Sequence, residues 1–332
     1  MADPTNAPND ALEAHALSKT YHLPPPPGRS GSLTVKAVRD VSLTLKPGRT
    51  MALVGESGCG KSTIAKMLSG LEPPTEGEIT LDGKDLAKPS ARLSAWRKGR
   101  RIQMIFQDPY ASLNPRWTVA KILQEALKAS GTVSRRDMRE ATLAALSAVG
   151  LPGNAAAKFP HEFSGGQRQR ISIARALACE PQFLICDEPT SALDVSVQAQ
   201  ILNVLKDVQA ERGLAFLLIT HDLSVVHHMA DHVGVMYLGQ LVEDREAGDL
   251  FAAPAHPYTR MLLDTIPRAD RPGRRPAVMS GEVPNPISPP TGCPFNPRCS
   301  FANDRCRAER PVPTPVSGGH VACHAIEEGR LA

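Results

Sequence analysis

A glycine-rich run after the short apolar segment 51–54 has the residue types and spacing needed to bind phosphate. It reads Gly55-Glu56-Ser57-Gly58-Cys59-Gly60-Lys61-Ser62 and fits the pattern G-x-x-x-x-G-K-[ST]. Glycines let successive backbone N–H groups converge on phosphate oxygens, and the N-terminus of the following helix adds partial positive charge. We expect Lys61 to neutralise the β- and γ-phosphates of ATP and Ser62 to ligate Mg²⁺. Thr63 completes the expected nucleotide-binding set.

Two adjacent carboxylates follow the apolar segment 183–186. Ligands of α/β sheets bind at the C-terminal ends of the strands, which is where Asp187 and Glu188 would lie. We expect Asp187 to hold the Mg²⁺ shell and Glu188 to polarise the attacking water. A general base of this kind contributes about 10²- to 10⁴-fold to a rate. A pair of ordinary surface carboxylates is the alternative, but both residues follow a buried run and precede Pro189.

Single polar residues follow two further expected strands. Gln107 comes after 102–106, and His221 comes after 215–219 and Thr220. A glutamine at a strand end can ligate Mg²⁺ and a water, and release both when a neighbouring domain moves. His221 is expected to sense the γ-phosphate and to orient the water or Glu188. An isolated histidine is usually structural or exposed, but its place at a strand end before Asp222 favours the functional interpretation.

A second candidate phosphate-binding surface lies at residues 164–167. The sequence is Ser164-Gly165-Gly166-Gln167, and it opens an expected helix about one helix length before the acidic strand end. A helix N-terminus with small residues can present N–H groups to a phosphate. The chain's own loop at 55–62 is not expected to use this surface, so the turn is predicted to serve another nucleotide.

Periodicity predicts the elements that must position these residues. Alternating apolar residues indicate a strand at 35–45, and short strands are expected at 51–54, 78–81, 102–106, 183–186, 215–219 and 233–237. Helices are expected from Lys61, across 119–150, over 167–179, and after Asp194, which would cap the last of them. The helical stretch lies between two strands, so an inserted subdomain is expected at about 112–180. Beyond Pro254 the chain is Pro-rich and is expected to be irregular.

The composition bounds the class of protein. The chain has 332 residues, 42% of them hydrophobic and 22% charged, which is typical of a globular protein with more than one domain. A spread-out net charge of +4 does not indicate nucleic-acid binding. No apolar run approaches the roughly 20 residues of a membrane span, and the polar N-terminus lacks a secretory signal. The chain is therefore expected to stay in the cytosol and to reach a membrane only through partner proteins.

The motifs, taken in order, resemble the ATP-binding cassette of ABC transporters over nearly the whole chain. Tyr21 matches the aromatic residue that stacks on adenine, although an ordinary half-buried tyrosine is the alternative. The turn at 164–167 matches the family signature, and 191–194 matches the loop that crosses the dimer interface. The resemblance implies an α/β P-loop NTPase fold with a RecA-like core, an antiparallel β subdomain, a helical insert and a small Cys-containing C-terminal extension.

The resemblance also implies a division of the chain and a branch of the family. Residues 1–11 are expected to be disordered, and the resemblance implies an ATP-binding domain at 12–254 and an extension at 255–332. Phe163 stands where leucine is usual, and it occurs in a context typical of the peptide-importer branch. The segments 106–116 and 256–259 and the Cys-rich tail point the same way. The chain is thus similar to ATP-binding subunits of dipeptide/oligopeptide importers, most like the second of the two that such importers usually carry.

Membership of that branch implies a set of partners and a location. The partners would be a second ABC ATPase subunit forming a heterodimer, two transmembrane permease subunits and an extracytoplasmic peptide-binding protein, with no nucleic acid. The chain would lie peripherally at the cytoplasmic face of the inner membrane. ATP and Mg²⁺ would be its cofactors, and ATP hydrolysis would drive peptide uptake. Nickel, glutathione or a sugar are alternative cargoes of the same family.

Four cysteines gather near the C-terminus. Cys293, Cys299, Cys306 and Cys323 are separated by 5, 6 and 16 residues. Four thiolates suit Zn²⁺ or a [4Fe–4S] cluster, but the spacing matches neither common zinc sites nor the ferredoxin run. Free thiols are the third alternative, and the resemblance to importers favours the cluster. Cys59 allows a redox-sensitive thiol or, preferably, a small residue whose backbone binds phosphate.

Other classes of function stay open from the sequence. A soluble ABC ATPase acting on ribosomes or DNA is less favoured, because the chain holds one cassette and lacks long coiled-coil insertions or a basic arm. A non-enzymatic regulatory cassette is disfavoured by the complete set of Lys61, Asp187, Glu188 and His221. The peptide-importer-like segments argue against an exporter.

Overall fold

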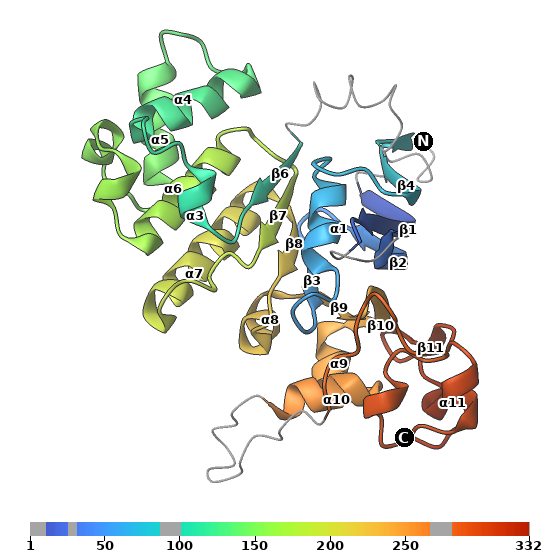
Figure 1. Ribbon diagram of the computed structural model, residues 1–332. Coiled ribbons are helices and arrows are strands. Elements are labelled where there is room, and N and C mark those ends of the chain that lie inside the picture. The colour runs from blue at the N-terminus through green and yellow to red at the C-terminus, as the bar shows by residue number, and fades with distance from the viewer. Residues whose placement is uncertain (1–10, 26–31, 87–100, 266–280, 332) are drawn as a thin grey trace, which may run out of the picture.

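A mostly parallel sheet forms the centre of the computed structural model, which describes residues 11–25, 32–86, 101–265 and 281–331 (Figure 1). Within those ranges the sheet has eight strands in the order β11-β12-β10-β9-β3-β8-β7-β6. Its parallel part comprises β3 (Thr50–Val54), β6 (Ile102–Ile105), β7 (Phe183–Asp187), β8 (Ala215–Ile219) and β9 (His232–Tyr237). Every residue of β3, β7 and β8 is buried, as expected for parallel strands covered on both faces. The strands predicted at these places are confirmed.

A second, antiparallel sheet has the order β2-β1-β4-β5 among the described residues. Its strands are β1 (Leu12–Leu23), β2 (Leu33–Leu45), β4 (Glu76–Leu81) and β5 (Lys84–Asp85). The second half of β2 alternates buried and exposed residues, which places Val41, Leu43 and Leu45 in the core. The predicted strand at 35–45 is therefore confirmed. The predicted disordered segment 1–11 lies, except for Ala11, outside the described residues.

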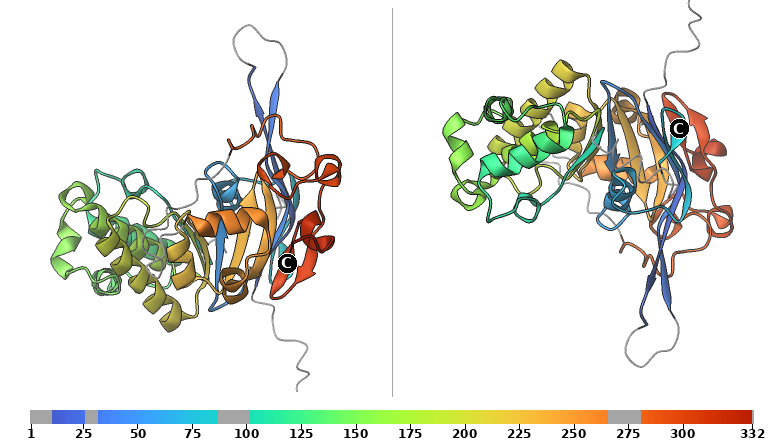
Figure 2. Two further views of the ribbon diagram at one scale, coloured as in Figure 1. Left: turned by 90° about the horizontal axis from the view of Figure 1, so that it is seen from below. Right: turned by 90° about the horizontal axis from the view of Figure 1, so that it is seen from above.

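Helices separate β6 from β7 and cover the central sheet. The inserted group comprises α3 (Pro109–Ser112), α4 (Val119–Ser130), α5 (Met138–Ser147), η1 (Gly153–Ala157), η2 (Pro160–Glu162) and α6 (Gly165–Leu177). The sheet-covering helices are α1 (Lys61–Leu68), α7 (Val195–Arg212) and α8 (Leu223–Met229). Asp194 caps α7 as predicted, because its carboxylate accepts a hydrogen bond from the Val197 N–H. Figure 2 shows the inserted helices on one side of the central sheet, and the N-terminal strands with the C-terminal segment on the other.

The C-terminal segment is more ordered than the sequence predicted. The sheet strand β10 (Gln240–Glu246) and α9 (Ala247–Ala252) precede Pro254, and the segment beyond it comprises α10 (Pro257–Asp264), η3 (Asn296–Arg298), α11 (Asp304–Ala308), β11 (Thr314–Val316), β12 (Gly319–Val321) and α12 (His324–Glu327). The prediction of an irregular tail was wrong because β11 and β12 are too short to show alternation. Strand β12 pairs with β10, and β11 pairs in turn with β12, so the two strands extend the central sheet. No helix of the described ranges is long and apolar enough to cross a bilayer.

The C-terminal segment shares a hydrophobic core with the central sheet. Val54, Val235 and Tyr237 of the sheet pack in one cluster with Tyr258 and Phe295 of the segment. All five side chains are almost completely buried. Movement of the C-terminal segment would therefore be coupled to the strand that precedes the phosphate-binding loop.

His256 makes the stability of this shared core depend on pH. Its ring accepts a hydrogen bond from the Tyr258 N–H at the start of α10, and burial lowers its pKa to about 3. The unfolded chain takes up a proton near pH 6.5, so the free energy of unfolding falls as the pH falls from 6.5 towards 3. At pH 5 the loss from this group should be about 2 kcal/mol.

Replacing His256 with Asn should remove that dependence, because Asn keeps a capping acceptor and does not titrate. Between pH 7.5 and pH 5, the wild type should lose about 2 kcal/mol more unfolding free energy than His256→Asn does. Urea denaturation at the two pH values measures it. Parallel pH dependences of the two proteins would show that His256 does not titrate as proposed.

Candidate functional site

The phosphate-binding loop connects β3 to α1 in the predicted strand–loop–helix order. Gly60, the residue before α1, has φ of 108°, and a Cβ there would lie 2.4 Å from the carbonyl oxygen of Ala37. Only glycine fits this close approach to β2. Lys61 is buried, and its Nζ donates to the carbonyl oxygens of Gly55 at 2.7 Å and Glu56 at 3.0 Å. Lys61 therefore donates its hydrogen bonds to carbonyl oxygens of its own loop. A bound phosphate would take the place of those two acceptors.

The two residues expected to ligate Mg²⁺ contact each other. Ser62 Oγ donates a hydrogen bond of 3.0 Å to Asp187 Oδ1, joining the first turn of α1 to the end of β7. Burial raises the pKa of Asp187, while the Ser62 hydrogen bond and the charge of Lys61 oppose that rise. A hydroxyl and a carboxylate at hydrogen-bonding distance form a fitting pair of oxygen donors for Mg²⁺. These donors fit the expected cation.

Two polar side chains from neighbouring strand ends contact the Glu188 carboxylate. Gln107 Nε2 donates to Glu188 Oε2 at 2.9 Å, and His221 Nδ1 lies 3.3 Å from Glu188 Oε1. Gln107, Glu188 and His221 follow β6, β7 and β8, which are neighbours in the sheet, so the three residues lie at one edge of it. Glu188 has the uncommon backbone φ of 46°, and its N–H donates to the Ile219 carbonyl. Such left-handed strain in a non-glycine residue is concentrated at functional sites.

Tyr21 lies beside the first turn of α1. Its hydroxyl donates to Glu72 Oε2 at 2.7 Å, and the ammonium of Lys19 lies 5.2 Å from the ring centre. Partial burial and the Glu72 carboxylate raise the pKa of Tyr21, and a hydrogen bond with Thr63 opposes them. The Tyr21 ring is thus close to the loop and only partly buried.

The turn at 164–167 begins α6 and forms a capping box. Ser164 Oγ accepts from the Gln167 N–H at 3.4 Å, and Gln167 Oε1 accepts from the Ser164 N–H at 3.1 Å. A Cβ at Gly166 would lie 2.3 Å from Val197 Cγ1, so glycine there permits close packing of α6 against α7. Figures 1 and 2 show α6 in the helical group, away from α1. The structure therefore does not bring this turn to the chain's own loop.

The loop has contacts that the sequence did not predict. Arg298 pairs with the Glu56 carboxylate, and the Tyr258 hydroxyl accepts from the Glu56 N–H. Arg298 is 242 residues from Glu56, and no local pattern marks such a contact. Tyr258 does lie in the segment 256–259 that resembles peptide importers, which was the available signal. Cys59 is buried, and burial raises the pKa of its thiol, which disfavours a reactive thiolate.

The four C-terminal cysteines lie in one neighbourhood. Cys293, Cys306 and Cys323 are buried, Cys299 is half-buried, and all four are free thiols. Burial first, and then the other three sulfurs, raise the pKa of Cys293 to about 12. Across the described ranges, however, no three or more His, Cys, Asp or Glu side chains are arranged to hold a metal ion. The described residues therefore do not show the metal or cluster site that was expected at these cysteines.

Comparison with known families supports the motif assignments. Residues 38–191 match the family model described as "ABC transporter". Residues 242–306 match the model described as "Oligopeptide/dipeptide transporter, C-terminal region". The second match covers much of the C-terminal segment that packs on the loop. The cassette and this segment are thus each similar to a region of transport proteins.

Curated relatives and solved structures extend the similarity to nearly the full length. A probable peptide ABC transporter ATP-binding protein of Sinorhizobium fredii is 49% identical over 94% of this chain and 89% of its own length. The dipeptide transport ATP-binding protein DppF of Escherichia coli is 47% identical over 96% of this chain and 95% of its own length. A dimeric ATP-binding cassette in a post-hydrolysis state, bound to ADP and Pi, has a TM-score of 0.62 and 29% identity, covering 71% of this chain and 98% of that one.

Proposed function

The chain belongs to the ABC transporter family, and we propose that it is the ATP-hydrolysing subunit of an importer of dipeptides and oligopeptides. The observation that carries this proposal is the similarity to peptide-transport ATP-binding proteins over both the cassette and the C-terminal region. A cassette match alone would leave the cargo class open. The complete set of polar residues at one sheet edge supports an active ATPase rather than a regulatory cassette.

Each residue of that sheet edge has a proposed role in ATP hydrolysis. The amides of the loop and Lys61 bind the phosphates, and Ser62, Asp187 and Gln107 would hold Mg²⁺, which supplies charge neutralisation when bound. Glu188 accepts a proton from the attacking water, and His221 orients Glu188 and contacts the γ-phosphate. The hydrogen bonds of Glu188 with Gln107 and His221 support these roles, because they hold the carboxylate in one orientation.

The Ser164–Gln167 turn is proposed to act on a nucleotide held by a partner cassette. Its first N–H groups and the α6 dipole favour the γ-phosphate, and their distance from the chain's own loop supports a role in trans. ATP would close the pair and hydrolysis would reopen it. We propose that the partner is a different ATPase subunit, so that the pair is a heterodimer.

The proposed assembly contains two permease subunits and an extracytoplasmic peptide-binding protein. The chain would lie peripherally at the inner face of the membrane, and its domains would divide at about residue 254. The relatives' roles in peptide transport support this arrangement. The closing motion would pass from Gln107 through the inserted helices to the permeases.

Peptide uptake by the reconstituted transporter tests the proposal. Proteoliposomes with ATP and Mg²⁺ inside should accumulate a labelled dipeptide when the binding protein is added, and ADP should not support uptake. Peptide-loaded binding protein should also raise the ATPase rate. Uptake of nickel, glutathione or a sugar in place of peptide would identify another cargo of the family. Co-purification with ribosomes instead of membranes would contradict import.

We propose that the four C-terminal cysteines hold a [4Fe–4S] cluster that cross-links and so stabilises the C-terminal segment. The support is the presence of four thiols in one neighbourhood, a number of sulfur donors that suits iron–sulfur clusters or zinc, although among the described residues they are not arranged as a ligand set. Anaerobic purification should give about four iron and four sulfide per chain, and Cys306→Ser should lower both. A protein with neither iron nor sulfide would contradict the cluster, and one Zn²⁺ per chain would replace it.

A further inference from the structure

The phosphate-binding loop is held from outside by an ion pair to the C-terminal segment. Arg298 Nη1 lies 2.7 Å from Glu56 Oε2, and Nη2 lies 3.0 Å from Oε1, so the pair is bidentate. The Arg298 side chain is only 2% exposed and that of Glu56 is 14% exposed. Bidentate arginine–carboxylate pairs fix geometry as well as adding energy, and burial strengthens them. Glu56 is the second residue of the loop, which makes this contact part of the loop's shape.

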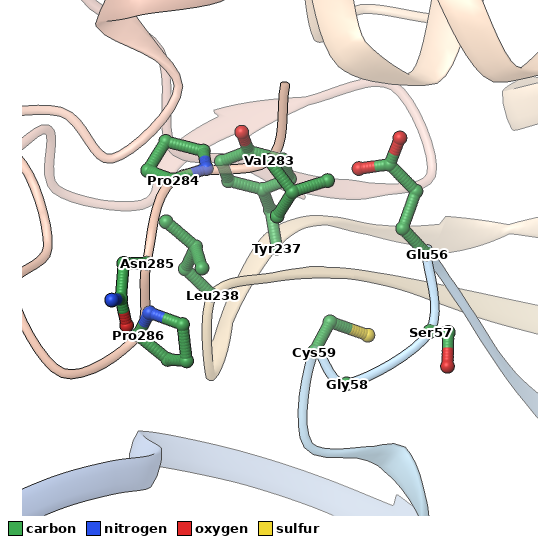
Figure 3. Close-up of a pocket in the computed structure, with 10 residues that line it drawn as sticks. All are labelled: Glu56, Ser57, Gly58, Cys59, Tyr237, Leu238, Val283, Pro284, Asn285 and Pro286. Atoms are coloured by element: carbon green, nitrogen blue, oxygen red, sulfur yellow. The ribbon is translucent and has the colours of Figure 1, made fainter.

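The main chain of the same loop residue is held by a second contact. The Glu56 N–H donates to the hydroxyl of Tyr258 at 2.9 Å, and Tyr258 is completely buried. Figure 3 shows the Glu56 carboxylate directed away from the side on which the Ser57 hydroxyl lies. Both the side chain and the backbone N–H of Glu56 therefore form their hydrogen bonds with the C-terminal segment and not with a nucleotide.

The groups that hold Glu56 are themselves fixed. Tyr258, Tyr237 and Phe295 form a cluster of three rings whose centres lie 4.8 to 5.4 Å apart. The Glu243 carboxylate of β10 accepts the N–H groups of Ala255 and His256, at 2.9 and 2.8 Å, which fixes the start of α10. Packed aromatic pairs of this kind are worth about 0.5–1.5 kcal/mol beyond their buried area. The anchor is thus part of a rigid core.

Packing does not fill the rest of the space between the loop and the C-terminal segment. A cavity of about 300 Å³ lies there, lined by Gly58 and Cys59 of the loop and by Val283, Pro284 and Pro286 of the segment (Figure 3). The outer face of the loop beside Glu56 therefore borders open space. Specific polar contacts at Glu56, rather than general packing, hold this part of the loop in place.

The anchored residue is next to the carbonyls that hold Lys61. Lys61 Nζ donates to the oxygens of Gly55 and Glu56, so the peptide groups on both sides of the Glu56 Cα set the position of the lysine. When phosphate replaces those acceptors, the loop must keep its form without the support of Lys61. A loop that is already in its binding form loses less affinity to conformational rearrangement.

We propose that Arg298 and Tyr258 are positioning residues for ATP binding: through Glu56 they hold the phosphate-binding loop in its nucleotide-competent form. The inference rests on the proposed ATPase function but not on the cargo. It assigns the C-terminal segment a role in the nucleotide site, in addition to any role of its cysteines. Loss of the anchor raises the KM for ATP because a smaller fraction of loops is competent, and it leaves kcat nearly unchanged because Glu188 and Asp187 are untouched.

The test measures KM and kcat for ATP in the purified full transporter. Arg298→Met should raise KM about tenfold with kcat within about threefold of wild type, and Arg298→Lys should restore part of the loss. Tyr258→Phe, which removes only the hydroxyl acceptor, should raise KM about threefold and serves if Arg298→Met does not fold. Glu56→Gln combined with Arg298→Met should raise KM by less than the product of the two single effects.

Arg305→Ala is the matched control, because Arg305 pairs with Glu309, Glu327 and Glu328 in the same segment and not with the loop. It should leave the KM for ATP unchanged. An unchanged KM in folded Arg298→Met or Tyr258→Phe would overturn the proposal, as would an equal rise in Arg305→Ala. Since KM is measured by hydrolysis alone, failure of peptide uptake would be a separate result that bears only on the cargo.

Discussion

Glu188→Gln is expected to lower ATP turnover by about 10²- to 10⁴-fold while leaving ATP binding intact. Glutamine has the same shape as glutamate and can still accept the hydrogen bond from Gln107 Nε2, so the site should keep its geometry. It cannot take the proton of the attacking water. The measurement is the steady-state release of phosphate by the full transporter, alongside the dissociation constant for ATP.

Glu180→Gln provides the control for Glu188→Gln. Glu180 precedes β7 at the end opposite to Glu188, and it accepts a hydrogen bond from Thr132. Its replacement removes the same charge from the same strand region without touching the nucleotide site, so turnover should match wild type. Hydrolysis by Glu188→Gln at the wild-type rate would show that another group activates the water.

Lys61→Ala is expected to weaken ATP binding by about 10²- to 10³-fold, with turnover falling accordingly. The Lys61 ammonium is buried and donates hydrogen bonds to two neutral loop carbonyls and to the Cys59 sulfur, so its charge is available to a phosphate. Removing one partner of a buried charge pair costs about 2–5 kcal/mol, and about 1.4 kcal/mol corresponds to tenfold in affinity. Titration with a fluorescent ATP analogue measures the loss.

Lys66→Ala is the control for Lys61→Ala, because Lys66 is an exposed residue of the same helix. It removes the same charge from α1 and should change the dissociation constant for ATP by less than about threefold, as expected for an exposed charge. A dissociation constant for Lys61→Ala within threefold of wild type would contradict the assignment of the loop.

The parallel core and its polar edge were predictable because their signals are local. Apolar runs such as 183–186 indicate strands buried on both faces, and the polar residues that the site uses follow such strands within two residues. The ends of parallel strands meet at one edge, so Gln107, Glu188 and His221 could be placed together before any distance was known. The structure brings these three side chains within hydrogen-bonding reach.

The C-terminal segment could not be predicted in the same way. Strands β11 and β12 have three residues each. They form because β12 pairs with β10 and β11 pairs with β12, and such pairing leaves no periodicity in the sequence. The contact of Arg298 with Glu56 joins residues 242 positions apart, and neither residue type is unusual in its local sequence. The burial of Arg298 is what marks its ion pair with Glu56 as significant, and the sequence alone does not show which arginine the fold will bury.

The Ser164–Gln167 turn is proposed to complete a nucleotide site on a partner cassette, and retention of nucleotide tests this most directly. The full transporter carrying Glu188→Gln should retain ATP through rapid desalting, since it closes but does not hydrolyse. Adding Ser164→Arg should abolish that retention, because the larger cation blocks the helix N-terminus that must meet the partner's γ-phosphate. ATP binding by the isolated chain should be unchanged, since Lys61 is untouched. Equal retention of ATP with and without Ser164→Arg would contradict a shared site.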